Sequence, residues 1–181
     1  LPPGTSGTLL SSNGTGTDPT WVSPNFTLQG YIAGLEISTP GSSTSFTVST
    51  GIGCDSTNST MLSLSSALTK TTSAWSVGSA GGALDTGTIA TFTWYYVFVI
   101  AKAGGANPDV LISTSISAPT LPATYTLFRR IGAMVTDASS HWYKFIQNGN
   151  TFTWDVPFAN AISVAITDTL GHLLTISTPL G

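Results

Sequence analysis

The sequence predicts an all-β protein, in which a β-sandwich or barrel-like domain follows an irregular, turn-rich N-terminal segment. Three observations support this fold class. Short apolar runs alternate with polar residues and are separated by Gly, Pro and Asn. β-branched and aromatic residues concentrate in the longest strongly apolar run, 94–101. Helical periodicity beyond two turns is not found.

Residues 1–30 form the first unit, which we expect to be an extended shaft or linker. Turn-forming residues recur every few positions, and the apolar pieces between them are only Leu9-Leu10 and Trp21-Val22. Such short pieces bury too little surface to offset the entropy of ordering the chain. The segment is therefore expected to pack against another domain or against copies of itself.

Residues 31–156 are expected to form the β-sandwich domain. Its predicted strands are 31–37, 45–49, 91–101, 110–115, 128–135, 141–147 and 151–154. Segment 91–101 is the clearest, because its second half is apolar on both faces, as in a central strand. Asn148-Gly149 is the clearest two-residue hairpin signal.

Three other stretches lie outside these predicted strands. Apolar residues at mixed spacing in 61–70 leave a helical turn and a strand end both open. Segment 118–123 contains two Pro and is expected to be a loop. Residues 157–181 resume the alternation and form either a short β unit or the start of a further domain. The first residue is not Met, which favours a fragment of a longer protein.

The composition excludes several partners. Charged residues make up 7% of the chain, against roughly 25% in ordinary soluble domains. With five Lys and Arg and a net charge of −3, the chain lacks a cationic surface for nucleic acid or an anionic membrane. No apolar run approaches the 18 residues or so of a membrane-inserted helix. The single cysteine, Cys54, cannot form an intrachain disulfide.

Catalytic patterns are sparse, so we do not expect an enzyme. The chain has one Glu, seven Asp and two His, and most Asp lie beside Gly, Pro, Ser or Thr in predicted turns. Nucleophile, phosphate-binding and zinc motifs are missing, so no metal or other cofactor is expected. A pair of carboxylates brought together in space, as glycosidases use, stays open at this stage.

Aromatic side chains are the better candidates for binding, because exposed rings stack on sugars while Ser and Thr hydrogen-bond hydroxyl groups. Trp75 lies in a Gly-rich stretch, and strict alternation over 141–147 places Trp142 and Lys144 together on an outward face. Trp75, Trp142 and Lys144 are therefore the candidate ligand-binding residues. Burial in the core or at a subunit interface is the competing interpretation for both Trp residues.

Arg129-Arg130 is the only pair of basic neighbours in the sequence. Adjacent residues of a strand point to opposite faces, so at most one of the two turns inward. A salt bridge to an Asp, a contact between subunits and binding of an acidic polysaccharide all remain open.

Two parts of the sequence resemble virion proteins of bacteriophages. Residues 1–22 resemble a pattern of tail-fibre proteins that carries Leu-Pro, Gly-Thr, Ser-Asn-Gly and Trp-Val at fixed places, here as LPPGTSGTLLSSNGTGTDPTWV. Residues 30–154 resemble a β module of phage and prophage tail proteins. The segments that carry this second resemblance are GYIAGLEIS, AWSVGSAGGALDTG, DVLISTS, APTLPATYTLFRRIG and NGNTFTW.

The resemblance implies a homotrimeric tail-fibre component in the extracellular virion, which contacts other tail proteins and a bacterial surface polysaccharide. Three chains would supply the apolar partners that residues 1–30 lack. Two alternatives are kept: a structural connector or collar domain without receptor contact, and a polysaccharide depolymerase. The scarcity of Glu and His weighs against the depolymerase. The resemblance identifies no receptor-contacting residue.

Overall fold

The computed structural model describes residues 2–22, 29–149 and 151–155. This part of the chain is all β apart from one short 3₁₀ turn, Ala103–Gly105, so the predicted fold class is confirmed. The strands are β1 (Leu9–Ser11), β2 (Thr20–Val22), β3 (Ile32–Gly34), β4 (Ile37–Ser38), β5 (Ser45–Val48), β6 (Gly51–Cys54), β7 (Met61–Leu64), β8 (Leu68–Ala74), β9 (Gly82–Leu84), β10 (Trp94–Lys102), β11 (Asp109–Ser113), β12 (Tyr125–Val135), β13 (Phe145–Asn148) and β14 (Thr151–Trp154).

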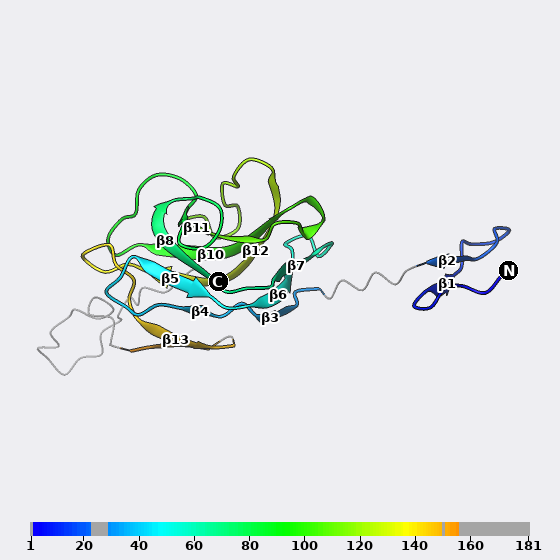
Figure 1. Cartoon of the computed structure of the whole chain (residues 1–181), viewed down its shortest axis with the longest axis horizontal. Coiled ribbons are helices and arrows are strands. Elements are labelled where there is room, and N and C mark those ends of the chain that lie inside the picture. The colour runs from blue at the N-terminus through cyan, green and yellow to red at the C-terminus, as the bar shows by residue number, and fades with distance from the viewer. Residues whose placement is uncertain (1, 23–28, 150, 156–181) are drawn as a thin grey trace, which may run out of the picture.

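Seven strands form a curled mixed sheet that resembles half of a barrel, in the order β12-β10-β11-β9-β8-β5-β4. The β11–β9 and β9–β8 pairs are parallel, and the other neighbours are antiparallel. A three-stranded antiparallel sheet, β3-β6-β7, and the hairpin β13–β14 lie beside it (Figure 1).

Strand β10 is buried on both faces, as the sequence predicts for 91–101. Its two flanking strands are β11 and β12, and the β10–β11 pair is the hairpin expected from the turn after residue 102. Alternate side chains of β10 enter two different clusters: Tyr95, Val97, Val99 and Ala101 in the first, and Tyr96, Phe98 and Ile100 in the second. A strand with this pattern needs cover on both sides of the sheet.

The two clusters cover opposite faces of the large sheet. The first and larger cluster also takes Leu62 and Leu64 from β7 and Phe145 from β13, so the small sheets close this face. The second takes Tyr125 of β12, with Ile116 and other residues of the loop between β11 and β12 packed against it. This connection contains segment 118–123, which the sequence predicts to be a loop.

One hydrogen bond joins the two ends of the domain. The backbone N–H of Ile37, in β4, donates to Oε1 of Gln147, in β13, at 2.7 Å. The two residues are 110 positions apart in the sequence. The hairpin β13–β14 forms at the predicted place in the chain, but its turn is displaced by one residue, because Asn148 pairs with Thr151. The hairpin packs beside β4 through this hydrogen bond.

The N-terminal segment contains a short hairpin rather than extended chain alone. Strands β1 and β2 pair antiparallel, with Leu9 opposite Val22 and Leu10 opposite Trp21. All four side chains stay exposed, by 52% for each Leu. The indole N–H of Trp21 donates to the carbonyl of Pro2 at 2.8 Å. The hairpin therefore offers apolar surface that the described chain does not cover.

Two predicted strands differ in the structure. The strand expected over 31–37 is broken into β3 and β4, because Leu35 adopts a positive φ of 57° and turns its side chain into the core. The strand expected over 141–147 begins only at Phe145. Strands β7 and β8 cover 61–64 and 68–70, so this stretch is β structure and not a helical turn. The predicted unit 157–181 lies outside the described residues.

Candidate functional site in an arginine-lined cleft

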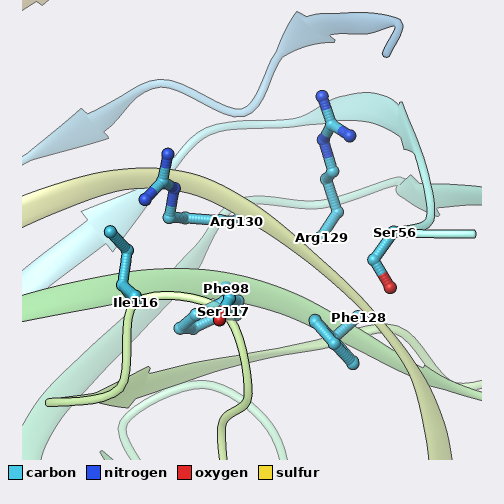
Figure 2. Close-up of a pocket in the computed structure, with 7 residues that line it drawn as sticks. All are labelled: Ser56, Phe98, Ile116, Ser117, Phe128, Arg129 and Arg130. Carbon is cyan, nitrogen blue, oxygen red and sulfur yellow. The ribbon is translucent and has the colours of Figure 1, made fainter. Parts of the chain in front are cut away.

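A cleft of about 500 Å³ lies along strand β12, at the edge of the described part of the large sheet. It is lined by residues of β10 and β12 and by two loops: Ser56, Phe98, Ile116, Ser117, Phe128, Arg129 and Arg130. Figure 2 shows the guanidinium groups of Arg129 and Arg130 apart from each other and directed away from the rings of Phe98 and Phe128, with Ile116 and Ser117 on the Arg130 side and Ser56 on the Arg129 side. The volume lies within the range of small-molecule sites, about 300–1,000 Å³.

The pairing of β12 with β10 fixes the positions of the two arginines. Arg130 lies opposite Phe98 and Arg129 opposite Val99, so the two side chains leave this edge strand on opposite faces of the sheet and line the cleft from different sides. The register then shifts between Val97 and Phe98, so that Ile131 is the extra residue of a β-bulge. Bulges at sheet edges re-aim neighbouring side chains, and this one follows directly after the arginine pair.

Each arginine is held by one contact, and neither contact is with a carboxylate. An Nη2–H of Arg129 donates to the carbonyl of Gly30 at 3.0 Å, and its Nε is buried without a hydrogen-bond partner among the described residues. The guanidinium of Arg130 lies over the ring of Tyr96, 5.7 Å from the centroid. Neither forms an ion pair within residues 2–22, 29–149 and 151–155, so the salt bridge to an Asp, one of the three roles that the sequence left open, is not found there.

The cleft concentrates positive charge in a chain that has little of it. Of the five Lys and Arg, Lys70 is paired with Asp109 and Lys144 with Asp155. Arg129 and Arg130 are thus two of the three cations without a carboxylate partner in the described structure, the third being Lys102. A cleft lined by one sign of charge raises the local concentration of oppositely charged ligands.

Apolar and hydroxyl groups complete the lining. The rings of Phe98 and Phe128 meet edge to face with centroids 5.9 Å apart, and Ile116 packs in the same cluster. Ser56 and Ser117 contribute hydroxyl groups from the two loops. The lining therefore combines guanidinium groups, hydroxyl groups and phenyl rings.

The loop that carries Ser56 is fixed by Asp55 on one side and by β12 on the other. The N–H of Ser56 donates to the carbonyl of Phe128 at 2.8 Å. Burial raises the pKa of Asp55, but hydrogen bonds from the Thr57 hydroxyl and from three backbone N–H groups outweigh burial and lower the pKa from 3.8 to about 2. A carboxylate that stays ionised near neutral pH thus holds one wall of the cleft in place.

The chemistry of this lining is suited to binding. It contains no carboxylate, His or Cys, so the described residues of the cleft offer no general acid, general base or activated nucleophile. A search of the described residues finds no group of three or more His, Cys, Asp or Glu able to hold a metal ion. None of the described helices is long and apolar enough to span a membrane.

The expectation that Trp142 faces outward is wrong. Its side chain is 0% exposed and packs edge to face against Phe46 and Tyr95, with centroids 5.9 and 5.8 Å away. Its indole N–H donates to the carbonyl of Thr44 at 3.1 Å. Strict alternation of inward and outward side chains does not hold here, because residues 141–144 do not form a regular strand. A turn at Asp137 precedes them and changes which side chains point inward. A buried ring cannot stack on a sugar.

Lys144 and Trp75 lie in different places. Lys144 is about half exposed, pairs with Asp155 at 3.1 Å, and lines a second cleft of about 380 Å³ that lies over Trp142. Trp75 is partly buried in the second cluster, edge to face with Tyr125 at 5.2 Å. The structure therefore brings Lys144 and Trp142 to one cleft and leaves Trp75 on the other face of the sheet.

Sequence patterns missed most of the arginine-lined cleft. Only Arg129-Arg130 stood out, whereas Ser56, Ser117 and Phe128 come from segments without a distinguishing signal. Comparisons of the chain with models of protein families, with curated proteins and with solved structures gave no match.

Proposed function

We propose that this protein is a homotrimeric component of a phage tail fibre, which contributes to attachment of the virion to a bacterial surface glycan. The observation that carries the proposal is the lining of the arginine-lined cleft: it offers hydrogen-bond donors, hydroxyl groups and phenyl rings, and no acid–base pair. Such a set of groups binds polyhydroxylated ligands without cleaving them. The resemblance of residues 1–22 and 30–154 to tail proteins supplies the biological setting.

The N-terminal hairpin supports the trimer. A two-stranded hairpin is marginally stable alone in water, and this one exposes Leu9, Leu10, Trp21 and Val22. Association of three copies would cover these side chains. Three clefts on one particle would then gain avidity, because each further contact with a polymeric receptor becomes intramolecular.

A structural connector is the second candidate, and the hairpin also favours it. Assembly with other virion chains is enough to explain the exposed apolar side chains of the hairpin, and it does not require that a receptor is bound. The two candidates differ in what the cleft does. Glycan binding by the trimer supports attachment, and a trimer that binds no glycan favours the connector.

The oligomeric state is tested by light scattering on a sizing column. We expect about 56 kDa, three times the chain mass of 18.6 kDa, for the wild type. The double variant Leu9→Asp, Val22→Asp should fall to 18.6 kDa, because carboxylates cannot be buried between apolar hairpins. Val77→Asp is the matched control, since Val77 is 71% exposed outside the hairpin. A monomeric wild type would contradict the trimer.

Attachment is tested on a panel of purified bacterial surface polysaccharides immobilised on a biosensor. We expect saturable binding of at least one polysaccharide, with slower dissociation for the trimer than for the Leu9, Val22 double variant. A size assay of the polysaccharide after incubation checks cleavage at the same time. Shortened polymer would contradict a binding role and favour the depolymerase.

A further inference from the structure

We infer that the arginine-lined cleft selects an anionic sugar unit, so that the glycan recognised is an acidic polysaccharide. This inference rests on the proposed function and adds the chemical class of the ligand. It is carried by three features of the described residues: two arginines without carboxylate partners, an adjacent apolar wall, and two serine hydroxyls.

The first feature is that both arginines of the cleft lack a carboxylate partner in the described structure. A guanidinium that has no counter-ion in the free protein can pair with a ligand carboxylate or phosphate without breaking an existing ion pair. Arg129 and Arg130 meet this condition in the described structure. Planar guanidinium groups also match carboxylate and phosphate oxygens in a two-bond geometry that an ammonium group cannot offer.

The contacts of the arginines keep them in place for such a ligand. The bond from Arg129 to the Gly30 carbonyl and the packing of Arg130 over Tyr96 restrict both side chains before any ligand arrives. Restricted side chains lose less conformational entropy on binding. The buried Nε–H of Arg129 donates to no oxygen atom among the described residues, so this donor is left unsatisfied in the free protein.

The remaining lining fits the neutral part of a sugar. Ile116 and Phe128 are partly exposed apolar surfaces, against which the C–H face of a pyranose ring can pack. Ser56 and Ser117 can donate to and accept from ring hydroxyl groups. At about 500 Å³ the cleft has room for a ligand of this class.

The second cleft does not share these properties. Its one lysine, Lys144, is already paired with Asp155, and Asp137 adds a further carboxylate to the lining. The charges of Lys144 and Asp155 cancel, and the carboxylate of Asp137 would attract a cation rather than an anion. The acidic ligand is therefore assigned to the cleft along β12.

The test compares three polymers on the 181-residue chain by isothermal titration calorimetry: a uronic acid polymer, a phosphate-bearing teichoic acid and neutral dextran. We expect binding of at least one anionic polymer and at least tenfold weaker binding of dextran, since hydrogen bonds to a charged partner are stronger than those between neutral groups. The stronger of the two anionic polymers identifies the anion as carboxylate or phosphate. Affinity should fall as salt is raised.

Arg130→Gln is the principal variant, because the amide keeps a hydrogen-bond donor and removes the charge. We expect at least tenfold weaker binding of the anionic polymer. Lys102→Gln removes a charge outside the cleft and should leave the affinity unchanged. Competition by free glucuronate and by inorganic phosphate on the wild type gives a readout that does not depend on a variant folding.

Two results overturn the inference, and they bear differently on the proposed function. Equal affinity for dextran and the anionic polymers, unaffected by Arg130→Gln, would exclude anion selection and leave glycan attachment standing. A trimer that binds no polymer of either charge, here or on the wider polysaccharide panel, would overturn attachment and anion selection together.

Discussion

The buried ion pair between Lys70 and Asp109 is the strongest single test of the fold. The Nζ and Oδ1 atoms are 2.7 Å apart, and the two side chains are 0% and 1% exposed. Lys70 also donates to the carbonyl of Ser76, and Asp109 accepts from the N–H groups of Gly78 and Val110. The pair therefore ties β8 and β11 to the turn between β8 and β9.

Replacing one partner leaves the other charge buried alone. We expect Asp109→Asn to lower the free energy of unfolding by about 3–5 kcal/mol, the usual cost of breaking a buried pair. Domains of this size have only about 5–15 kcal/mol in total, so the midpoint of thermal unfolding should fall by roughly 10 °C or more. The double variant Lys70→Met, Asp109→Asn removes both charges and should recover most of the loss.

The loss should depend on pH in a defined direction. Burial lowers the pKa of Lys70 below 10.5, whereas the hydrogen bond and charge of Asp109 raise it. Asp109→Asn removes the raising contributions, so the pKa of Lys70 falls further. A lysine whose pKa is lower in the folded than in the unfolded state binds fewer protons when folded, so stability rises with pH between those two values. The defect of the variant should therefore shrink from pH 7 toward pH 10.

Urea unfolding at pH 7 and pH 9.5, followed by circular dichroism, measures both effects. Lys144→Met is the matched control, because it breaks an ion pair whose side chains are nearly half exposed, and such pairs contribute about 0–1 kcal/mol. Equal losses in Asp109→Asn and Lys144→Met would contradict the energetic cost of breaking the buried pair. A defect of Asp109→Asn that grows with pH would contradict a lowered pKa of Lys70 in the variant.

Three further substitutions probe separate parts of the domain. The pKa of Asp55, about 2, lies below its ordinary 3.8, so its stabilisation is complete above about pH 4 and is lost toward pH 2; Asp55→Asn should flatten this dependence in thermal melts from pH 2 to 6. Gly51→Ala would place a Cβ 2.4 Å from backbone atoms, whereas Gly53→Ala in the same strand meets its nearest atom at 3.4 Å, so urea unfolding should show a large loss only for Gly51→Ala. Trp142→Ala should cost about 3–5 kcal/mol of unfolding free energy; a loss under 1 kcal/mol would contradict its burial.

Local signals in the sequence account for the elements that were predicted correctly. The central strand β10 is apolar on both faces, and two glycines turn it back into β11. The signal Asn148-Gly149 located the hairpin β13–β14 to within one residue: Asn148 pairs with Thr151, and Gly149 follows it with a positive φ of 57°. In these cases the pairing partner is the next strand along the chain, so neighbouring residues are sufficient to specify it.

Sequence patterns did not predict the parallel strand pairs. Strand β9 has only three residues, and it lies between β8 and β11 because Gly82 lets the backbone approach: an added Cβ would lie 2.0 Å from the carbonyl of Ala74. Burial of Trp142 likewise depends on Phe46 and Tyr95, which are far away in the sequence. Such contacts are decided by tertiary packing rather than by strand periodicity.

The candidate site shows the same limit. Alternation correctly separates Arg129 from Arg130 along β12, since they oppose Val99 and Phe98 of β10. What makes these residues a site is the approach of Ser56 and Ser117 from two distant loops. Single residues such as Ser in loops carry no signal in a chain that has 24 of them.

The hydrogen bond between Ile37 and Gln147 also has a consequence for biosynthesis. Ile37 leaves the ribosome 110 residues before its partner, which at 5–20 residues per second is a delay of about 5 to 20 seconds. During this delay the nascent sheet keeps an open edge, and the N-terminal hairpin has already emerged. If nascent chains associated through their hairpins at this stage, open edges of different chains would be brought together and would pair. We therefore expect productive assembly to be post-translational, after each domain has closed on its own hairpin β13–β14.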